Sequence, residues 1–351
     1  MKEQKSTKNI DVIKLNNINF KPKVSVIIPC YNVERYIDST LQSMQEQTMG
    51  DIEIICIDDG SIDETQQVLI QRARKDERIS VLHQTNSGQG GARNQGALLA
   101  QGEYLYFMDS DDLLENNALE ELYERAVRED LDVLYFDGIS FFDTEQLEQQ
   151  NESYEGYYLR GNDYSGVKTG IEMMCAMRKN KEYRHSPCLQ LIKNAYFHDK
   201  ELWFLPGVFH EDNSFTFRTM VLASKVGHMN VPFFCRRIRE ESVMTSKETF
   251  KHCYGYFVNY LNMLQCAWKL DMDVLQEEEV SRIVHNAIKN ARKTYRKITR
   301  EEQENYNKLP PLERDLFKQL VVRNKKNEEQ KEKQSIKTIF GKNRRKERIK
   351  E

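Results

Sequence analysis

Short apolar runs that end abruptly in polar residues constrain the fold of this chain more than any other feature. Residues 104–112 read YLYFMDSDD, in which five largely apolar residues are followed by three acids within four positions. Runs of similar length stand at 24–29 (VSVIIP) and 52–57 (IEIICI), and stretches with helical apolar spacing separate the runs. Such runs are typical of buried strands. The alternation of strand and helix across residues 24–137 therefore predicts an α/β fold with a mostly parallel sheet and helices on both faces.

The rest of the sequence divides by composition into regions of different character. Residues 209–223 predict a helix, and residues 225–238 predict two strands on either side of Pro232. We expect the following parts in order: a polar tail (1–22), the first half (23–137) and second half (138–248) of one α/β domain, a helical region (249–322) and a basic tail (323–351).

Overall composition excludes several classes of protein. A hydrophobic content of 39% over 351 residues is enough for a large core, so the chain as a whole is not expected to be disordered. A net charge of −3 argues against a general nucleic-acid-binding protein. The seven cysteines lack CxxC spacing, which indicates a reducing compartment rather than a disulfide or zinc framework. Because no leader-like segment or run of eighteen apolar residues is present, we expect a cytoplasmic location.

Two aspartates at the end of the run at 104–108 suggest a metal site. Asp109 and Asp111 flank the small residue Ser110, and if the chain turns there, both carboxylates can face one point. Oxygen ligands of this kind suit a divalent cation. The alternative interpretation is an ordinary strand end followed by a helix N-cap, because Asp and Ser serve both purposes.

Two further strand ends should line the same crevice if the strands are neighbours. The ring of Tyr31 can lie along a nucleobase, and Asp58 or Asp59 can accept the N–H of uracil. The alternatives are a packed tyrosine and an ordinary turn, in which Ser61 and Glu64 form a capping box for the next helix.

A glycine-rich loop at residues 86–91 precedes a predicted helix at 92–100. Glycines allow a backbone to approach a ligand closely, and Arg93 at the start of a helix favours anions. The loop lacks the spacing of a dinucleotide fingerprint or a P-loop, so NAD and P-loop functions are disfavoured. A pyrophosphate held by a metal fits this combination better.

Four segments, VSVIIPCYNVERYI, IDDGSIDET, NSGQGGARNQGA and YLYFMDSDD, occur in an order and spacing that resemble the family 2 glycosyltransferases of the GT-A fold. The resemblance is to the bacterial capsular or exopolysaccharide type and covers residues 23–137, the half that would bind the nucleotide sugar. It implies that Asp109 and Asp111 form a DxD motif holding Mg²⁺ or Mn²⁺, which neutralises the leaving diphosphate. The residues implied in binding a UDP-sugar donor are Pro29, Tyr31, Asp58, Asp59, Ser61, Gly90, Arg93, Asp109 and Ser110.

A second resemblance lies in the other half, where the acceptor would bind. His210, Glu211 and Asp212, followed by the segment FFCRRIREESVMTS at 233–246, resemble the ED motif and the arginine-rich segment of polysaccharide-building members. The resemblance implies that Asp212 is the general base of a single inverting displacement. His210, Glu211, Arg236 and Arg239 would contact the acceptor or the diphosphate. The alternatives are acids that favour the first turn of a helix and arginines on a solvated strand face.

The function expected from these features is transfer of a sugar from a UDP-sugar to a hydroxyl of a surface polysaccharide, a lipid-linked acceptor or a related glycan. The alternatives are a sugar-1-phosphate nucleotidyltransferase and a non-catalytic nucleotide-sugar-binding scaffold. No nucleic-acid partner is expected, and a homo-oligomer is compatible with the sequence. The basic stretch at 337–350 contains interleaved apolar residues, which suits a helix on an anionic membrane surface at the inner face of the cell membrane. Its alternative is a solvated terminus.

Overall fold

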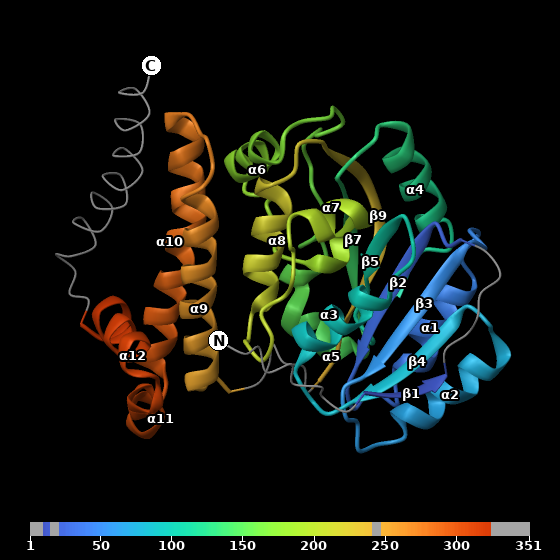
Figure 1. Ribbon diagram of the computed structural model, residues 1–351, viewed down its shortest axis with the longest axis horizontal. Helices are drawn as coiled ribbons and strands as arrows, with labels where there is room; N and C mark the ends of the chain where they lie inside the picture. The colour runs from blue at the N-terminus through green and yellow to red at the C-terminus, as the bar shows by residue number, and fades with distance from the viewer. Residues whose placement is uncertain (1–9, 15–20, 241–246, 324–351) are drawn as a thin grey trace, which may run out of the picture. The chain divides into compact units, whose positions relative to one another are not determined.

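The computed structural model describes residues 10–14, 21–240 and 247–323, which belong to two units (Figure 1). The first unit comprises the residues up to Gly207 together with Phe215–Thr245. The second comprises Val208–Ser214 and the residues from Ser246 onward. Apart from Arg323, the predicted basic tail lies outside the described residues, as do 241–246.

A mixed β-sheet forms the centre of the first unit. Its strands, as far as the structure describes the chain, have the spatial order β1-β4-β3-β2-β5-β8-β7-β9-β6. The neighbours β4, β3, β2 and β5 run parallel to one another, as predicted, whereas β8 is antiparallel to both β5 and β7. The strands are β1 (Ile10–Lys14), β2 (Val24–Cys30), β3 (Ile52–Asp58), β4 (Ile79–Gln84), β5 (Tyr104–Phe107), β6 (Leu113–Leu114), β7 (Val133–Phe142), β8 (Gln190–Lys193) and β9 (Val226–Ile238).

Helices bury both faces of this sheet, which explains why the central strands read as unbroken apolar runs. Val26 and Ile28 on β2 belong to a core that also contains Leu41 from the first helix. Ile27 points to the opposite face, where it lies against Gly96 of the third helix so closely that a Cβ there would be 2.4 Å from an Ile27 methyl group. The helices that begin in this part of the chain are α1 (Ile37–Gln45), α2 (Thr65–Lys75), α3 (Gln89–Leu99), α4 (Ala118–Arg128), α5 (Glu145–Asn151), α6 (Gly170–Lys179) and α7 (Asn194–Asp199).

Several local predictions were wrong because pairing with distant segments decides the structure. Residues 10–14, predicted as tail, form β1, which pairs antiparallel with β4. The capping box of Ser61 and Glu64 is not formed, because the Ser61 hydroxyl accepts a hydrogen bond from the Asn32 backbone instead. The third helix begins at Gln89 rather than Ala92, inside the predicted glycine loop.

The segment around Pro232 is one strand with a bulge rather than two strands. Pairing of β9 with β7 passes from Phe136–Met229 directly to Gly138–Phe234, so the residues between bulge out of the ladder. Proline is tolerated there because a bulge does not require its missing N–H.

A buried charge cluster lies at this bulge. Asp137 is fully buried and accepts hydrogen bonds from the Arg160 guanidinium at 2.7 Å and from the Arg160 backbone at 3.0 Å. His228 Nε2 lies 2.8 Å from the same carboxylate, and burial lowers the pKa of His228, so the neutral ring donates this bond. The cluster therefore links β7, β9 and the loop that carries Arg160.

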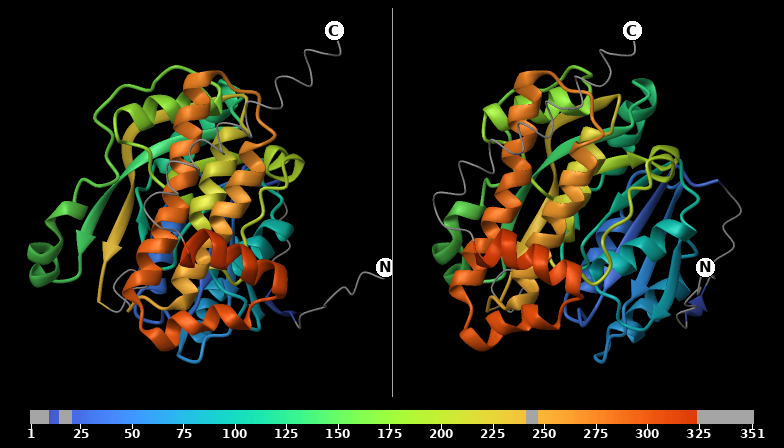
Figure 2. Two further views of the ribbon diagram at one scale, coloured as in Figure 1. Left: turned by 90° about the vertical axis from the view of Figure 1, so that its left-hand side faces the viewer. Right: turned by 60° about the vertical axis from the view of Figure 1, so that its left-hand side comes forward.

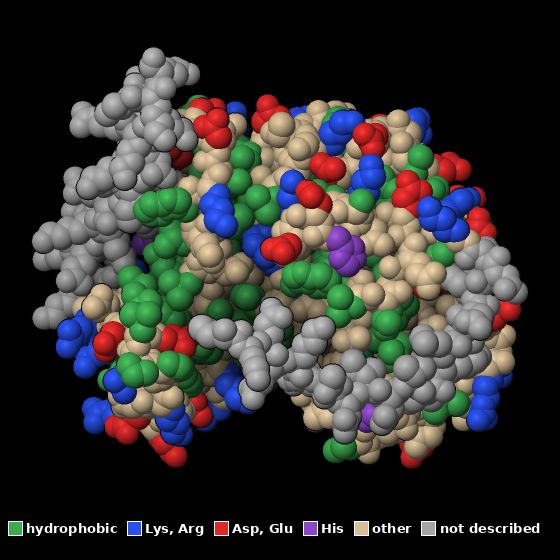
Figure 3. All heavy atoms as spheres, in the orientation of Figure 1, with side chains coloured by type: hydrophobic (Ala, Val, Ile, Leu, Met, Phe, Trp, Pro, Cys, Tyr) green, Lys and Arg blue, Asp and Glu red, His purple; other side chains and the backbone are tan. Residues whose placement is uncertain are grey.

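The second unit is helical, in agreement with the pattern after Thr249. It contains α9 (Phe250–Ala267), α10 (Val274–Lys297), α11 (Arg300–Glu304) and α12 (Pro311–Phe317), and α9 and α10 lie side by side (Figures 1 and 2). The helix α8 (Glu211–Val221) has its first turn in this unit and its remainder in the first unit. Over the described part of the chain, none of the helices combines the length and apolarity needed to cross a bilayer. Charges of both signs are interspersed on the face in Figure 3.

Candidate functional site

The predicted site residues of the first unit gather at one edge of the sheet. The strands β3, β2 and β5 are neighbours, so their carboxyl ends meet, as expected for a ligand crevice in an α/β sheet. The pairing of β2 with β3 and with β5 continues for one residue beyond the strands. The Asp59 backbone donates to the Cys30 carbonyl at 2.8 Å, and the Met108 backbone donates to the Ile27 carbonyl at 3.0 Å. Both Pro29 and Ser61 lie along this edge.

The loops after β2 and β3 are joined by hydrogen bonds. Asn32, whose φ is 51°, donates from its backbone to the Ser61 hydroxyl at 3.1 Å, and its side chain accepts from the Ile62 backbone at 2.9 Å. The Val33 backbone donates to the Thr65 hydroxyl at 2.8 Å. Tyr31, at the tip of this arrangement, is 50% exposed. The ring is therefore presented to solvent, and the alternative of a packed tyrosine is wrong.

Asp58 and Asp59 are both buried and both bonded within the protein. Asp58 accepts from the Ser61 backbone at 3.0 Å and lies 2.8 Å from His83 Nδ1. Asp59 accepts from the backbones of Ser87 and Gly88 at 2.8 and 2.9 Å. Asp59 thus fixes the start of the glycine loop, and recognition of uracil by either carboxylate stays a prediction.

The glycine loop leads into α3 and brings Arg93 to the DxD segment. Gly88 has a φ of 80°, a conformation that favours glycine, and Gly90 is buried in the first turn of α3. Arg93, 2% exposed, donates to Asp109 Oδ1 at 2.6 Å, and the Gln89 side chain donates to the same oxygen at 2.9 Å. Sequence reasoning missed Gln89, although it stands within the glycine loop.

The turn at residues 109–112 is held by side chains from distant elements. The Thr40 hydroxyl on α1 donates to the carbonyl groups of Ser110 and Asp112 at 3.1 and 2.8 Å. The Arg237 backbone donates to the Asp112 carboxylate at 2.7 Å, and Arg239 Nε donates to Asp111 Oδ2 at 2.7 Å. No sequence pattern points to Thr40, because its role depends on packing between α1 and this turn.

The carboxylates of this turn repel one another electrostatically. Burial raises the pKa of Asp111, the negative charge of Asp109 adds to the rise, and Arg239 opposes it. Burial and the charges of Asp111 and Asp109 also hold the pKa of Asp112 well above its ordinary value. Although burial opposes it, the pKa of Arg236 is raised by Tyr158 and by the carboxylates of Asp112 and Asp109. A cation placed beside Asp109 and Asp111 would relieve this repulsion.

The carboxylate oxygens of Asp109 and Asp111 suit a divalent cation that takes most of its ligands from a substrate. Within the described residues, the hydrogen bonds to Asp109 fall on Oδ1 alone, so Oδ2 is not engaged by the protein. No group of three or more His, Cys, Asp or Glu side chains suited to a metal occurs among these residues. Mg²⁺ typically binds one or two carboxylates together with substrate phosphates and water, which is the arrangement that Asp109 and Asp111 allow.

The segment with His210, Glu211 and Asp212 belongs to the second unit. His210 has a φ of 62° and stacks on Tyr256 of α9 with ring centroids 4.0 Å apart. Burial raises the pKa of Tyr256 to about 12, with the negative charge of Asp212 as the next cause, so Asp212 lies near this ring. Glu211 and Asp212 occupy the first turn of α8, which also agrees with the alternative that they favour a helix start. The role of Asp212 as a base stays a prediction.

Comparisons with known proteins find similar glycosyltransferases. The model of the family described as "Glycosyl transferase family 2" matches residues 25–186. Glycosyltransferase GlyG of Streptococcus pneumoniae is 30% identical over 230 residues, which cover 64% of this chain and 73% of that protein. TuaG of Bacillus subtilis, named for teichuronic acid biosynthesis, is 44% identical over 107 residues, or 30% of this chain and 42% of that protein.

The fold is also found among solved structures. The structure of S. aureus TarS residues 1–349 with UDP-GlcNAc has a TM-score of 0.63 at 22% identity and covers 85% of this chain and 81% of that one. Fold and sequence together define a GT-A glycosyltransferase. The chain belongs to glycosyl transferase family 2.

Proposed function

We propose that this protein transfers a sugar from a UDP-sugar to a hydroxyl of a surface polysaccharide, a lipid-linked acceptor or a related glycan, in one displacement that inverts the anomeric carbon. The observation that carries the proposal is the convergence of Tyr31, the glycine loop and the carboxylates of Asp109 and Asp111 at one sheet edge. Two similar proteins support the substrate classes, since TarS binds UDP-GlcNAc and TuaG is named for the synthesis of a glycan.

Asp109 and Asp111 would hold Mg²⁺ or Mn²⁺ in this reaction. The bound ion supplies Lewis-acid stabilisation of the departing UDP. The protein contributes the geometry, because Arg93 and Arg239 fix the two carboxylates and Thr40 fixes the turn between them. Tyr31 would lie along the uracil ring, and Arg236 would balance negative charge on the diphosphate.

Asp212 would remove the proton of the acceptor hydroxyl as that oxygen attacks the anomeric carbon. The bond from the sugar to UDP breaks in the same step, and the carboxylate keeps the proton. A positioned base of this kind contributes roughly 10²–10⁴-fold to a rate. Asp212→Asn should therefore lower turnover by at least ~10²-fold with UDP affinity nearly intact, measured by steady-state kinetics and calorimetry. Loss of UDP affinity instead would show that Asp212 has a structural role.

A screen of nucleotide sugars with Mn²⁺ tests the proposal directly. UDP release would be scored with and without membrane lipids and glycans as acceptors, and pyrophosphate release would indicate a nucleotidyltransferase instead. UDP binding without turnover against any extract would support a scaffold.

Asp111→Asn should abolish transfer and its dependence on metal, because one of two anionic ligands is lost. Asp143→Asn is the matched control, since it neutralises an aspartate that pairs with Arg237 and does not belong to the DxD motif. Activity of Asp111→Asn at the level of the unaltered protein would refute the metal assignment.

A further inference from the structure

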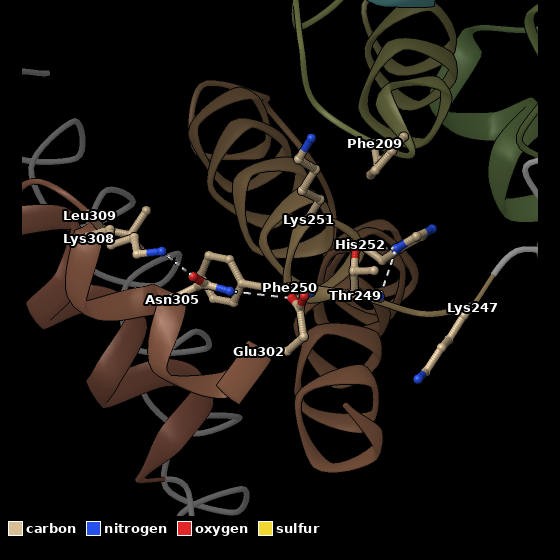
Figure 4. A pocket seen from close by; sticks show the side chains of 10 residues that line it. All are labelled: Phe209, Lys247, Thr249, Phe250, Lys251, His252, Glu302, Asn305, Lys308 and Leu309. Atoms are coloured by element: carbon tan, nitrogen blue, oxygen red, sulfur yellow. Dashed lines mark hydrogen bonds between the residues drawn. The ribbon is translucent and has the colours of Figure 1, made fainter. Parts of the chain in front are cut away.

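A cavity of about 620 Å³ opens in the second unit at the start of α9 (Figure 4). Three lysines from separate segments line it: Lys247 precedes α9, Lys251 lies in its first turn, and Lys308 follows α11. The aromatic rings of Phe209 and Phe250 contribute apolar surface to the same cavity. The lining thus combines cationic groups with aromatic faces.

The lysines keep their positive charge available. Within the part of the chain that the structure describes, none of the three forms an ion pair with a carboxylate, and Lys308 donates to the Asn305 side chain at 2.8 Å. Glu302, the one acid among the lining residues, accepts from the Phe250 backbone at 2.8 Å and from Asn305 at 3.4 Å. The cavity therefore carries an excess of positive charge.

A neighbouring cavity provides a contrast within the same unit. Its lining includes Lys297, which pairs with Glu248 at 3.3 Å, and it contains further acids. The two cavities share Lys247 and Glu302, so the positive excess comes from Lys251 and Lys308, which line the first cavity and not the second. Phosphate and carboxylate groups are the ligands that bind such ammonium groups through charge-assisted hydrogen bonds.

One face of α9 connects this cavity with the acidic segment before α8. The ring of His252, in the first turn, stacks on Phe209 with centroids 4.7 Å apart. One turn further, or about 6 Å along the helix axis, Tyr256 stacks on His210. Asn259 then donates to the Phe209 carbonyl at 3.3 Å, so the segment follows this face of the helix.

Asp212 lies next to the part of this α9 face that is further from the cavity. Its charge acts on Tyr256, and the next residue but one, Ser214, donates from its backbone to the Asn259 side chain at 3.2 Å. The lysine-lined cavity and Asp212 therefore lie along the same face of α9, one to two helical turns apart, or ~6–11 Å of axial rise. A sugar ring spans a distance of this order.

We propose that the cavity holds a negatively charged group of the acceptor glycan, a phosphate or a carboxylate, next to the sugar whose hydroxyl Asp212 deprotonates. The inference rests on the proposed function, since it takes Asp212 as the base, and it adds that the acceptor is anionic. The ammonium groups of Lys247, Lys251 and Lys308 point in different directions around the cavity (Figure 4), so they attract the anion by charge, and their flexible side chains would turn toward it on binding. The ring of Phe209 supports an apolar face of the sugar.

The test combines Lys247→Gln, Lys251→Gln and Lys308→Gln in one protein, with Lys289→Gln as control because Lys289 is exposed on α10 and does not line the cavity. Methyl phosphate and glucuronate serve as probes of protein saturated with UDP, so that the donor site is filled, and binding is measured by calorimetry. One of the two should bind the unaltered protein and identify the anion. The triple variant should lose at least ~10-fold in affinity and the control none. Equal binding by the triple variant, or no binding of either probe, overturns the proposal.

Steady-state kinetics and vesicle binding distinguish an acceptor-binding cavity from a membrane-binding surface. In the triple variant the acceptor KM should be at least ~10-fold higher and kcat unchanged. Lysine-to-arginine changes at the same three positions keep the positive charge and should leave the acceptor KM at the value of the unaltered protein. An unchanged acceptor KM overturns the assignment to the acceptor. If binding to phosphatidylglycerol vesicles depends on these lysines while the small anions do not bind, the surface is a membrane contact and the proposal is wrong. Release of UDP from the donor in water tests the proposed function separately.

Discussion

Replacing Asp137 with Asn tests how much the buried charge cluster at the β7–β9 bulge stabilises the first unit. The carboxylate is fully buried, and it accepts two hydrogen bonds from Arg160 and one from His228 at 2.7 to 3.0 Å. Asn keeps an acceptor but removes the negative charge, so the Arg160 guanidinium, 1% exposed, is left without a counter-ion. Removing one partner of a buried ion pair costs about 3–5 kcal/mol, and the retained acceptor places this variant near 3.

Thermal unfolding followed by circular dichroism measures this effect. For a unit of this size each kcal/mol shifts Tm by about 2–4 °C, so a fall of roughly 6–12 °C is expected. Asp199→Asn is the control, because its ion pair with Lys200 is exposed and should contribute less than ~1 kcal/mol. Adding Arg160→Met to Asp137→Asn should recover part of the loss, because the unpaired charge is then gone. A fall below ~2 °C, or no recovery in the double variant, would refute the reasoning.

Two other predictions concern the second unit and pH. Burial, with the charge of His252 as the next cause, lowers the pKa of His210 to about 4, and burial also lowers the pKa values of His228 and His252. Because the unfolded chain binds these protons at higher pH, the stabilisation is present above pH ~6.5 and is lost as the pH falls toward ~4, by roughly 2 kcal/mol at pH 5 for His210 alone. Urea unfolding at pH 7 and pH 5 checks this, and a smaller loss in His210→Gln is expected; identical losses in both proteins would contradict the assignment to His210. Gly255→Ala should destabilise the second unit by about 1–3 kcal/mol, because the added Cβ would lie 2.3 Å from the Phe209 carbonyl oxygen, and an unchanged denaturant midpoint would show that this segment moves freely.

The positions of the strands at the crevice could be predicted, because local runs of apolar residues are enough to indicate a buried strand. The run at 104–108 is apolar on both sides, and its burial in the middle of a sheet follows from that property alone. The grouping of Tyr31 with Asp109 was expected only if the strands were neighbours, and the order of β3, β2 and β5 in the structure shows that they are. The strand β8 was not predicted, because a segment of four residues is too short to show a clear hydrophobic periodicity.

The partners of the site residues could not be predicted, since they come from distant parts of the chain. Asp59 accepts hydrogen bonds from glycine-loop residues that lie 28 and 29 positions further along the chain. The Thr40 hydroxyl donates to a carbonyl of the DxD turn that lies 70 positions further along. Only the packing of α1 and α3 on the sheet brings these groups together. The same reason applies to Asn259 on α9, whose side chain bonds to Phe209 before Asp212 and to Ser214 after it.

The hydrogen bonds from Ser87 and Gly88 to Asp59 have a consequence for ligand affinity. A glycine-rich loop that is free to move would lose conformational entropy when a ligand orders it, at about 1–2 kcal/mol for each residue fixed. Here a buried carboxylate already fixes the first residues of the loop, and the turn at Gly88 is set before any diphosphate arrives. The loop is thus preorganised, so more of the interaction energy with a ligand remains as binding affinity.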